Sequence, residues 1–111
     1  LATYAHKLTK ADAVIDWSQS AQQIDRKIRA FNAYPTAFTW YHGEPLRFFS
    51  STVADATSSA PAGTVIAESK TGIDIATGSG VVRVLRLQLP GGKQLSAAEF
   101  VNARSLLGEC F

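Results

Sequence analysis

The sequence predicts a mostly β domain with flanking helices, in which short strands close into a small barrel. Two features support this prediction. After Pro35 the chain alternates short aromatic or β-branched runs with turns rich in Gly, Ser and Pro, spaced roughly eight to twelve residues apart. Apolar residues form 46% of the 111 residues, which is enough for one core and leaves little room for a second domain.

One amphipathic helix is expected before the strands. Ser20 and Gln23 have the spacing of a capping box, in which each side chain accepts a hydrogen bond from the backbone of the other. Asn32 is expected to cap the end of the helix, and Pro35 prevents it from continuing. One apolar stripe recurs at helical spacing and consists of Ala21, Ile24, Ile28 and Phe31.

Residues 1–13 are polar and basic, and we expect them to form an interdomain linker ahead of a domain that spans residues 14–111. The chain contains no Met, so we expect it to be a piece of a longer protein. Trp17 and its apolar neighbours would anchor the linker on the domain. Both Trp17 and Trp40 are expected to pack in the apolar interior rather than stack on bases.

Five strands are expected in the runs between the turns, at residues 36–41, 46–54, 64–68, 73–77 and 81–89. Ser96 and Glu99 form a second capping box, which predicts a short last helix through Arg104. Turns this frequent favour closure of the sheet. The expected architecture is therefore a five-stranded, OB-like Greek-key barrel with an N-terminal helix and a short C-terminal helix. An open α+β sheet is the alternative.

No residue of the sequence is expected to be catalytic. His6 and His42 fall in the linker and in a turn, without Cys or acidic partners at ligand spacing, so no metal site is expected. Cys110 stands near the end of the chain with no base beside it. The sequence has neither a secretory signal nor an apolar run of about 20 residues, which favours a cytoplasmic protein.

The basic residues are the remaining candidates for function. The net charge is only +2, so composition alone does not predict nucleic-acid binding, and an ordinary solvated surface is the alternative. Arg83 and Arg86 have opposite parity on one strand and share a face only if a bulge intervenes. A converging basic face would bind phosphates without reading sequence. The candidates for such a face are Lys7, Lys10, Arg26, Arg29, Arg47, Lys70, Arg83, Arg86 and Lys93.

Several blocks of the sequence resemble the C-terminal domain of the methionyl-tRNA formyltransferase family. Residues 15–18 (Ile-Asp-Trp-Ser) and 28–32 (Ile-Arg-Ala-Phe-Asn) resemble its beginning, and together they are fairly specific. Residues 72–80 and 87–93 are similar to a hairpin and to the closing segment of that domain, although Ser79 stands where an Asp is common. The resemblance covers nearly the whole chain in the right order.

The resemblance implies that two domains divide the work. In that family an N-terminal Rossmann-like domain, no part of which is in this sequence, formylates the amino group of methionyl initiator tRNA with 10-formyltetrahydrofolate. The C-terminal domain is an OB-like barrel that helps to hold the tRNA on a positively charged face, and Lys7 and Lys10 match its basic linker. The implied partners are therefore initiator methionyl-tRNA and the catalytic domain of the same protein. The chain alone would be an inactive monomer without a cofactor of its own.

Two other functions stay open at this point. One is the accessory barrel of a related formyltransferase that acts on a nucleotide sugar or a folate. The other is a purely structural or dimerising domain. The sequence of a preceding domain would separate the first from tRNA binding, and salt-sensitive binding of tRNA would argue against the second.

Overall fold

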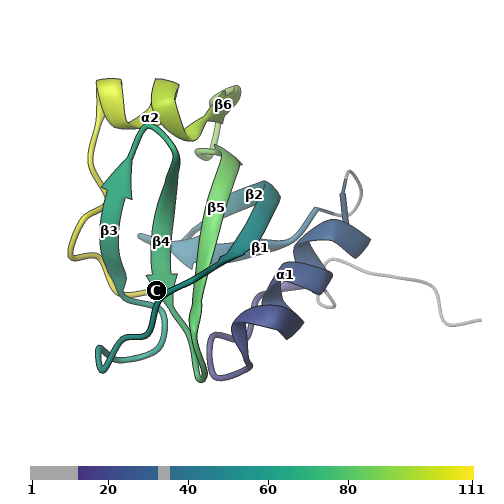
Figure 1. Cartoon of the computed structure of the whole chain (residues 1–111). Helices are drawn as coiled ribbons and strands as arrows, with labels where there is room; N and C mark the ends of the chain where they lie inside the picture. The colour runs from purple at the N-terminus through teal and green to yellow at the C-terminus, as the bar shows by residue number, and fades with distance from the viewer. Residues whose placement is uncertain (1–12, 33–35) are drawn as a thin grey trace, which may run out of the picture.

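A computed structural model of the chain describes residues 13–32 and 36–111. Within these ranges it contains one six-stranded sheet, with one helix before the strands and one after them (Figure 1). The elements in chain order are α1 (Ala21–Ala30), β1 (Phe38–Tyr41), β2 (Glu44–Ala54), β3 (Val65–Ser69), β4 (Gly72–Ala76), β5 (Val81–Gln88), β6 (Gln94–Ser96) and α2 (Ala97–Ala103).

The strands lie in the order β1-β2-β5-β4-β3, and β6 pairs with β5 beyond the end of β4. Every pair is antiparallel. β1 and β3 end the sheet and do not pair with each other, so the sheet is open. The expected closed barrel is therefore wrong, and the chain forms an open sheet, as the alternative proposed.

Short flanking segments, rather than a closing strand pair, cover parts of both edges of the sheet. Beside β1, the amide of Ile15 donates to the carbonyl of Phe38 at 2.9 Å. Beside β3, the amide of Val65 donates to the carbonyl of Glu109 at 2.8 Å, and the amide of Gly108 donates to the carbonyl of Val65 at 3.0 Å. Unpaired backbone groups of an edge strand attract further strands. The flanking segments satisfy several of these groups locally, which weakens the drive towards closure.

Both capping boxes form as predicted. The side chain of Ser20 accepts a hydrogen bond from the amide of Gln23, whose side chain accepts one from the amide of Ser20. Ser96 and Glu99 make the same reciprocal pair at the start of α2. These pairs satisfy backbone donors that the first turn of a helix leaves free, so they define where each helix begins.

Two other local predictions are wrong. α1 is capped by Phe31 rather than by Asn32, because the amide of Phe31 still donates to the carbonyl of Lys27 at 3.0 Å. Residues 94–96 were not among the predicted strands, yet they form β6 on the edge of β5 that β4 leaves free. The bounds of the other strands agree with the prediction to within about two residues.

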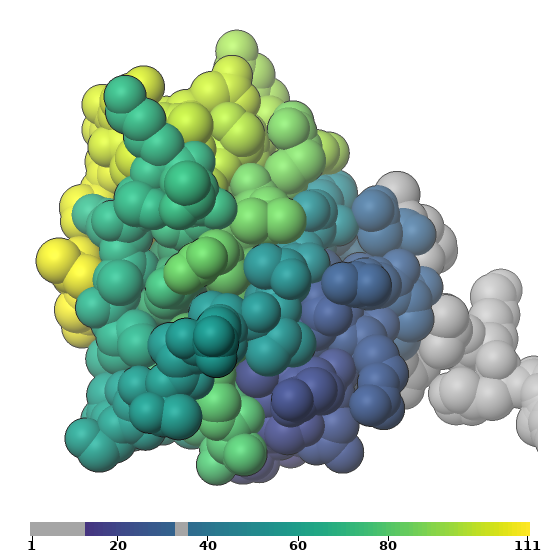
Figure 2. Space-filling model, viewed as in Figure 1, coloured from purple at the N-terminus to yellow at the C-terminus, as the bar shows by residue number. Residues whose placement is uncertain are grey.

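The apolar stripe predicted on α1 is part of the core. Ile24 and Ile28 are both 0% exposed. Trp17, just before the helix, is also buried, and its Nε1–H donates to the Thr39 hydroxyl of β1 at 2.9 Å. Figure 2 shows that strand atoms, in teal and green, reach the surface between α1, in dark blue, and the C-terminal part, in yellow. On this side the helices therefore flank the sheet and do not cover all of it.

The turn between β4 and β5 packs closely against the segment that leads into α1. The amide of Gly78 is within hydrogen-bond distance of two carbonyls, that of Trp17 at 2.9 Å and that of Gln19 at 3.0 Å. A Cβ atom at Gly78 would lie 1.9 Å from the carbonyl oxygen of Ser18. That oxygen belongs to the backbone and cannot rotate away, so the lack of space requires glycine here.

We expect Gly78→Ala to lower the free energy of unfolding by about 1–3 kcal/mol, because the new methyl group forces the turn away from the segment before α1. Urea denaturation followed by tryptophan fluorescence measures this loss. Ser79→Ala is the control, since Ser79 is exposed in the same turn and should change stability by no more than about 0.5 kcal/mol. Equal stability of the two variants would contradict the steric explanation.

Candidate nucleic-acid interface

A bulge interrupts the pairing of β2 with β5. Ser50 and Ser51 are consecutive on β2, but their partners on β5 are separated by Leu85. An extra residue of this kind reverses the alternation of side chains along its strand. Arg83 and Arg86, which regular alternation would send to opposite faces, therefore project from the same face of the sheet.

Arg47 of β2 lies on that face too. It pairs with Gln88, which is separated from Arg86 only by the buried Leu87. Paired residues of neighbouring antiparallel strands share a face of the sheet, and residues two apart on one strand do so as well. We call the side that carries Arg47, Arg83 and Arg86 the outer face. The opposite side of these strands faces the apolar interior.

An acidic neighbour largely balances the charge of Arg83. Its Nε and Nη2 donate to the two carboxylate oxygens of Asp74 at 2.7 and 3.0 Å. These hydrogen bonds, together with the negative charge of Asp74, raise the pKa of Arg83 above its ordinary value. Gly72 makes room for the pair, since a Cβ there would lie 2.2 Å from Cγ of Arg83. Arg83 is thus an ordered part of the face rather than its strongest free cation.

Within the described residues, two arginines of the outer face, Arg47 and Arg86, form no ion pair, although Glu99 lies near enough for the charge of Arg86 to lower its pKa. Nε of Arg86 donates to the neutral amide oxygen of Gln94 at 2.7 Å. Lys93 is exposed in the turn between β5 and β6, next to this end of the sheet. Guanidinium groups with free donors suit the oxygens of a phosphate, which they bind through parallel hydrogen bonds.

The two arginines predicted on the helix do not join this face. α1 packs against the opposite side of β2, where the Ser51 hydroxyl donates to the Asp25 carboxylate at 2.7 Å. Arg29 forms an ion pair with the same carboxylate at 3.1 Å. Arg26 is exposed on the helix. These cations therefore belong to a different surface from Arg47.

The remaining predicted candidates are lysines. Lys70 is exposed in the turn between β3 and β4. Lys7 and Lys10 lie outside the described residues. Of the nine candidates, the structure thus brings together Arg47, Arg83 and Arg86, with Lys93 at one end of the group.

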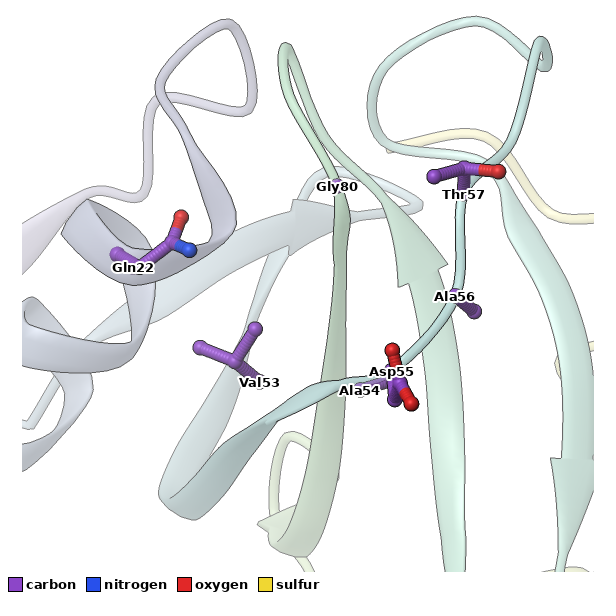
Figure 3. Close-up of a pocket in the computed structure, with 7 residues that line it drawn as sticks. All are labelled: Gln22, Val53, Ala54, Asp55, Ala56, Thr57 and Gly80. Carbon is purple, nitrogen blue, oxygen red and sulfur yellow. The ribbon is translucent and has the colours of Figure 1, made fainter.

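A hollow of about 600 Å³ opens at the end of β2, beside the first turn of α1 (Figure 3). Gln22, residues 53–57 and Gly80 line it. Figure 3 shows the Gln22 amide and the Asp55 carboxylate on different elements, without a common point towards which both are directed. None of these lining residues is basic, so the hollow does not suit a phosphate group.

The described ranges contain no group of three or more His, Cys, Asp and Glu side chains that could hold a metal ion. His42 lies in the turn between β1 and β2, as predicted, with its side chain 72% exposed. Neither helix of the described part has the length and apolar character needed to cross a membrane.

Comparison with known families shows to which family the domain with this outer face belongs. The family described as the formyl transferase C-terminal domain matches residues 7–105. The chain belongs to this family. The membership confirms the family resemblance seen in the sequence.

Relatives of this formyl transferase domain include two bacterial enzymes named methionyl-tRNA formyltransferase. The chain is 47% identical over 102 residues to the enzyme of Coxiella burnetii strain RSA 331, covering 92% of the chain and 32% of the enzyme. It is 48% identical over 111 residues to that of Dichelobacter nodosus, covering 99% of the chain and 35% of the enzyme. The chain thus spans about a third of the length of these relatives.

A solved structure shares the fold of the formyl transferase domain. HypX from Aquifex aeolicus, in complex with tetrahydrofolic acid, superposes with a TM-score of 0.69 at 20% sequence identity. The match covers 86% of this chain and 17% of HypX. At this identity the likeness concerns the fold alone.

Trp40 is a residue of the outer face that we did not predict to be exposed. It lies on β1 and pairs with Pro45, two residues before Arg47 on β2, so its indole shares the face of that arginine. The packing predicted for Trp17 is confirmed, because Trp17 is only 7% exposed. The same prediction is wrong for Trp40, which is 55% exposed. The alternation along β1 predicts two faces but does not tell which residues of a face are covered, and Phe38 on the face of Trp40 is buried.

The cap of α2 links the basic end of the sheet to the stability of the domain in acid. Hydrogen bonds from the backbone and the side chain of Ser96 hold the pKa of Glu99 below its ordinary 4.5, and the charges of Arg86 and Lys93 lower it further. A depressed folded-state pKa means that the ionised form stabilises the folded state above pH 4.5. This stabilisation is lost as the pH falls below that value.

We therefore expect Glu99→Gln to lose less stability than the wild-type domain between pH 7 and about pH 3. Gln keeps the capping acceptor, as Gln23 does in α1, but does not titrate. Urea midpoints at the two pH values measure the difference. Glu44→Gln is the matched control, because Glu44 is an exposed carboxylate on β2 that belongs to neither capping box. If wild type and Glu99→Gln lose the same stability between pH 7 and about pH 3, ionisation of Glu99 does not stabilise the cap of α2.

Proposed function

We propose that this chain is the C-terminal domain of a methionyl-tRNA formyltransferase and that it binds tRNA on the outer face of its sheet. The observation that carries the proposal is the bulge at Leu85, which brings Arg86 to the same face as Arg47 and Arg83. The two relatives named methionyl-tRNA formyltransferase support tRNA as the ligand, in preference to a nucleotide sugar or a folate.

The proposed contacts are with phosphate oxygens. Among the residues that the structure describes, Arg47 forms no ion pair and Arg86 donates to the neutral Gln94. Phosphate contacts from such guanidinium groups position a nucleic acid without reading its sequence. Lys93 adds a third cation at the end of the face. The ordered Arg83–Asp74 pair holds the neighbouring surface in place.

In the proposed whole enzyme, initiator methionyl-tRNA is the substrate and the chemistry belongs to an N-terminal catalytic domain of the same cytoplasmic protein. 10-Formyltetrahydrofolate would supply the formyl group in that domain. Residues 1–13 would act as the interdomain linker, with Lys7 and Lys10 adding phosphate contacts. Joining two tRNA contacts by a linker makes the second contact effectively intramolecular and so raises the overall affinity. The 111-residue chain alone would bind tRNA as a monomer without formylating it.

The test is binding of initiator tRNA by the 111-residue chain, followed by fluorescence anisotropy over a range of salt concentrations. We expect the logarithm of the affinity to fall linearly with the logarithm of the salt concentration, because each phosphate contact releases bound counterions. Undetectable binding at low salt, or an affinity that does not depend on salt, would contradict the proposal.

A further inference from the structure

Trp40 differs from the other large apolar side chains of the domain. Only Trp40 and Leu107 are strongly exposed among the large hydrophobic residues of the described ranges. A single exposed apolar residue is ordinary on a protein surface. The exposure of Trp40 therefore points to a function only if the groups around it fit a ligand.

The indole of Trp40 is held in place by its own strand. Its ring meets the ring of Phe38 edge to face, with centroids 5.1 Å apart and an angle of 90° between the planes. Phe38 lies two residues away on the same face of β1 and is only 7% exposed, so it anchors the contact from the side. Thr39, between the two, accepts the hydrogen bond from the buried Trp17. Ordering the indole on a ligand would therefore cost little further conformational entropy.

One arginine neighbours this indole on the outer face, and a second lies farther away on the next strand. Arg47 is a diagonal neighbour of Trp40 across β1 and β2, at a spacing of about 7–8 Å that long side chains can bridge. Arg86 follows on the next strand, β5. The outer face thus carries an exposed aromatic ring on β1, a neighbouring arginine on β2 and a second arginine on β5, whose Nε donates to the neutral amide of Gln94.

From this arrangement we infer that Trp40 stacks on an unpaired base of the bound RNA while Arg47 and Arg86 bind the adjoining phosphates. The inference rests on the proposed tRNA binding and specifies that the domain contacts a nucleotide whose base is unpaired. Aromatic platforms beside cations are the usual means of binding single-stranded nucleic acid, since every base has a face that can stack. Bases inside an RNA duplex are stacked on one another and are not available to Trp40. The positive charge beside the indole favours a nucleic acid over an apolar protein partner.

The test compares two probes with the 111-residue chain, a short oligouridylate and an RNA duplex of equal length. We expect Trp40→Leu to weaken oligouridylate binding by about 5- to 150-fold, the loss of one stacked base. The slope of affinity against salt should not change, since no charge is lost. Trp40→Phe should recover part of the affinity, and duplex binding should be the same for all variants.

Leu107→Ala is the control, because it removes an equally exposed apolar side chain that lies outside the sheet. It should leave both affinities unchanged. If the wild-type chain binds neither RNA, the proposed function fails. If the wild-type chain binds RNA but Trp40→Leu binds oligouridylate equally well, only the stacking inference fails. Equal weakening of oligouridylate and duplex binding by Trp40→Leu would also overturn it.

Discussion

Ile28→Ala is expected to lower the free energy of unfolding of the domain by about 2–4 kcal/mol. Ile28 is 0% exposed and lies on the single apolar stripe through which α1 contacts the sheet. Shortening the side chain removes buried methyl and methylene groups and leaves a cavity that its neighbours only partly fill. The loss is a large fraction of the whole stability of a domain of this size. Equilibrium urea denaturation, monitored by fluorescence, measures it.

Gln22→Ala provides the matched control on the same helix. Gln22 is exposed, so this substitution should change the free energy of unfolding by no more than about 0.5 kcal/mol. A loss below about 1 kcal/mol for Ile28→Ala would mean that the stripe is not part of the core. The position of α1 against β2 would then need revision.

The double variant Arg47→Gln/Arg86→Gln is expected to bind tRNA about 100-fold more weakly than the wild-type chain at low salt. A hydrogen bond to a charged group contributes about 1.5–3 kcal/mol, and the lower end of this range corresponds to about tenfold in affinity for each of the two contacts. Gln keeps much of the length and polarity of each side chain but not its charge. Fluorescence anisotropy with labelled tRNA measures the change.

A loss of folding does not account for such a result, because both arginines lie on the outer face and neither forms an ion pair among the described residues. Their replacement should leave the free energy of unfolding within about 0.5 kcal/mol of wild type. Unchanged tRNA affinity in the double variant, with a wild-type chain that does bind, would remove the outer face from the function.

Local features of this fold were predictable from the sequence. The capping boxes at Ser20 and Ser96 each depend on two side chains three residues apart, so the starts of both helices follow from short segments. The strands follow similarly from runs of aromatic and β-branched residues between turns. In each case the deciding contacts lie within a few residues along the chain.

Features that depend on distant contacts were not predictable. The sheet stays open partly because Ile15 and Glu109, far apart in sequence, bond to its two edges. The shared face of Arg83 and Arg86 depends on Leu85 having no partner on β2. From the sequence we could say only that the two arginines share a face if a bulge intervenes. Whether a bulge forms depends on the register, which is set by pairing between strands. The exposure of Trp40 likewise depends on how far along β1 the rest of the chain covers this face, since Phe38 on the same face is buried.

The most direct test of the central claim compares two double variants of the 111-residue chain. One is Arg47→Gln/Arg86→Gln on the sheet, and the other is Arg26→Gln/Arg29→Gln on α1, which removes the same charge from the opposite side of β2. The measured quantity is the slope of log affinity for tRNA against log salt concentration. We predict that the sheet variant lowers the magnitude of the slope by about two, one unit for each lost contact, and that the helix variant leaves it unchanged. A reduced slope for the helix variant, with a wild-type slope for the sheet variant, would contradict binding of tRNA on the outer face.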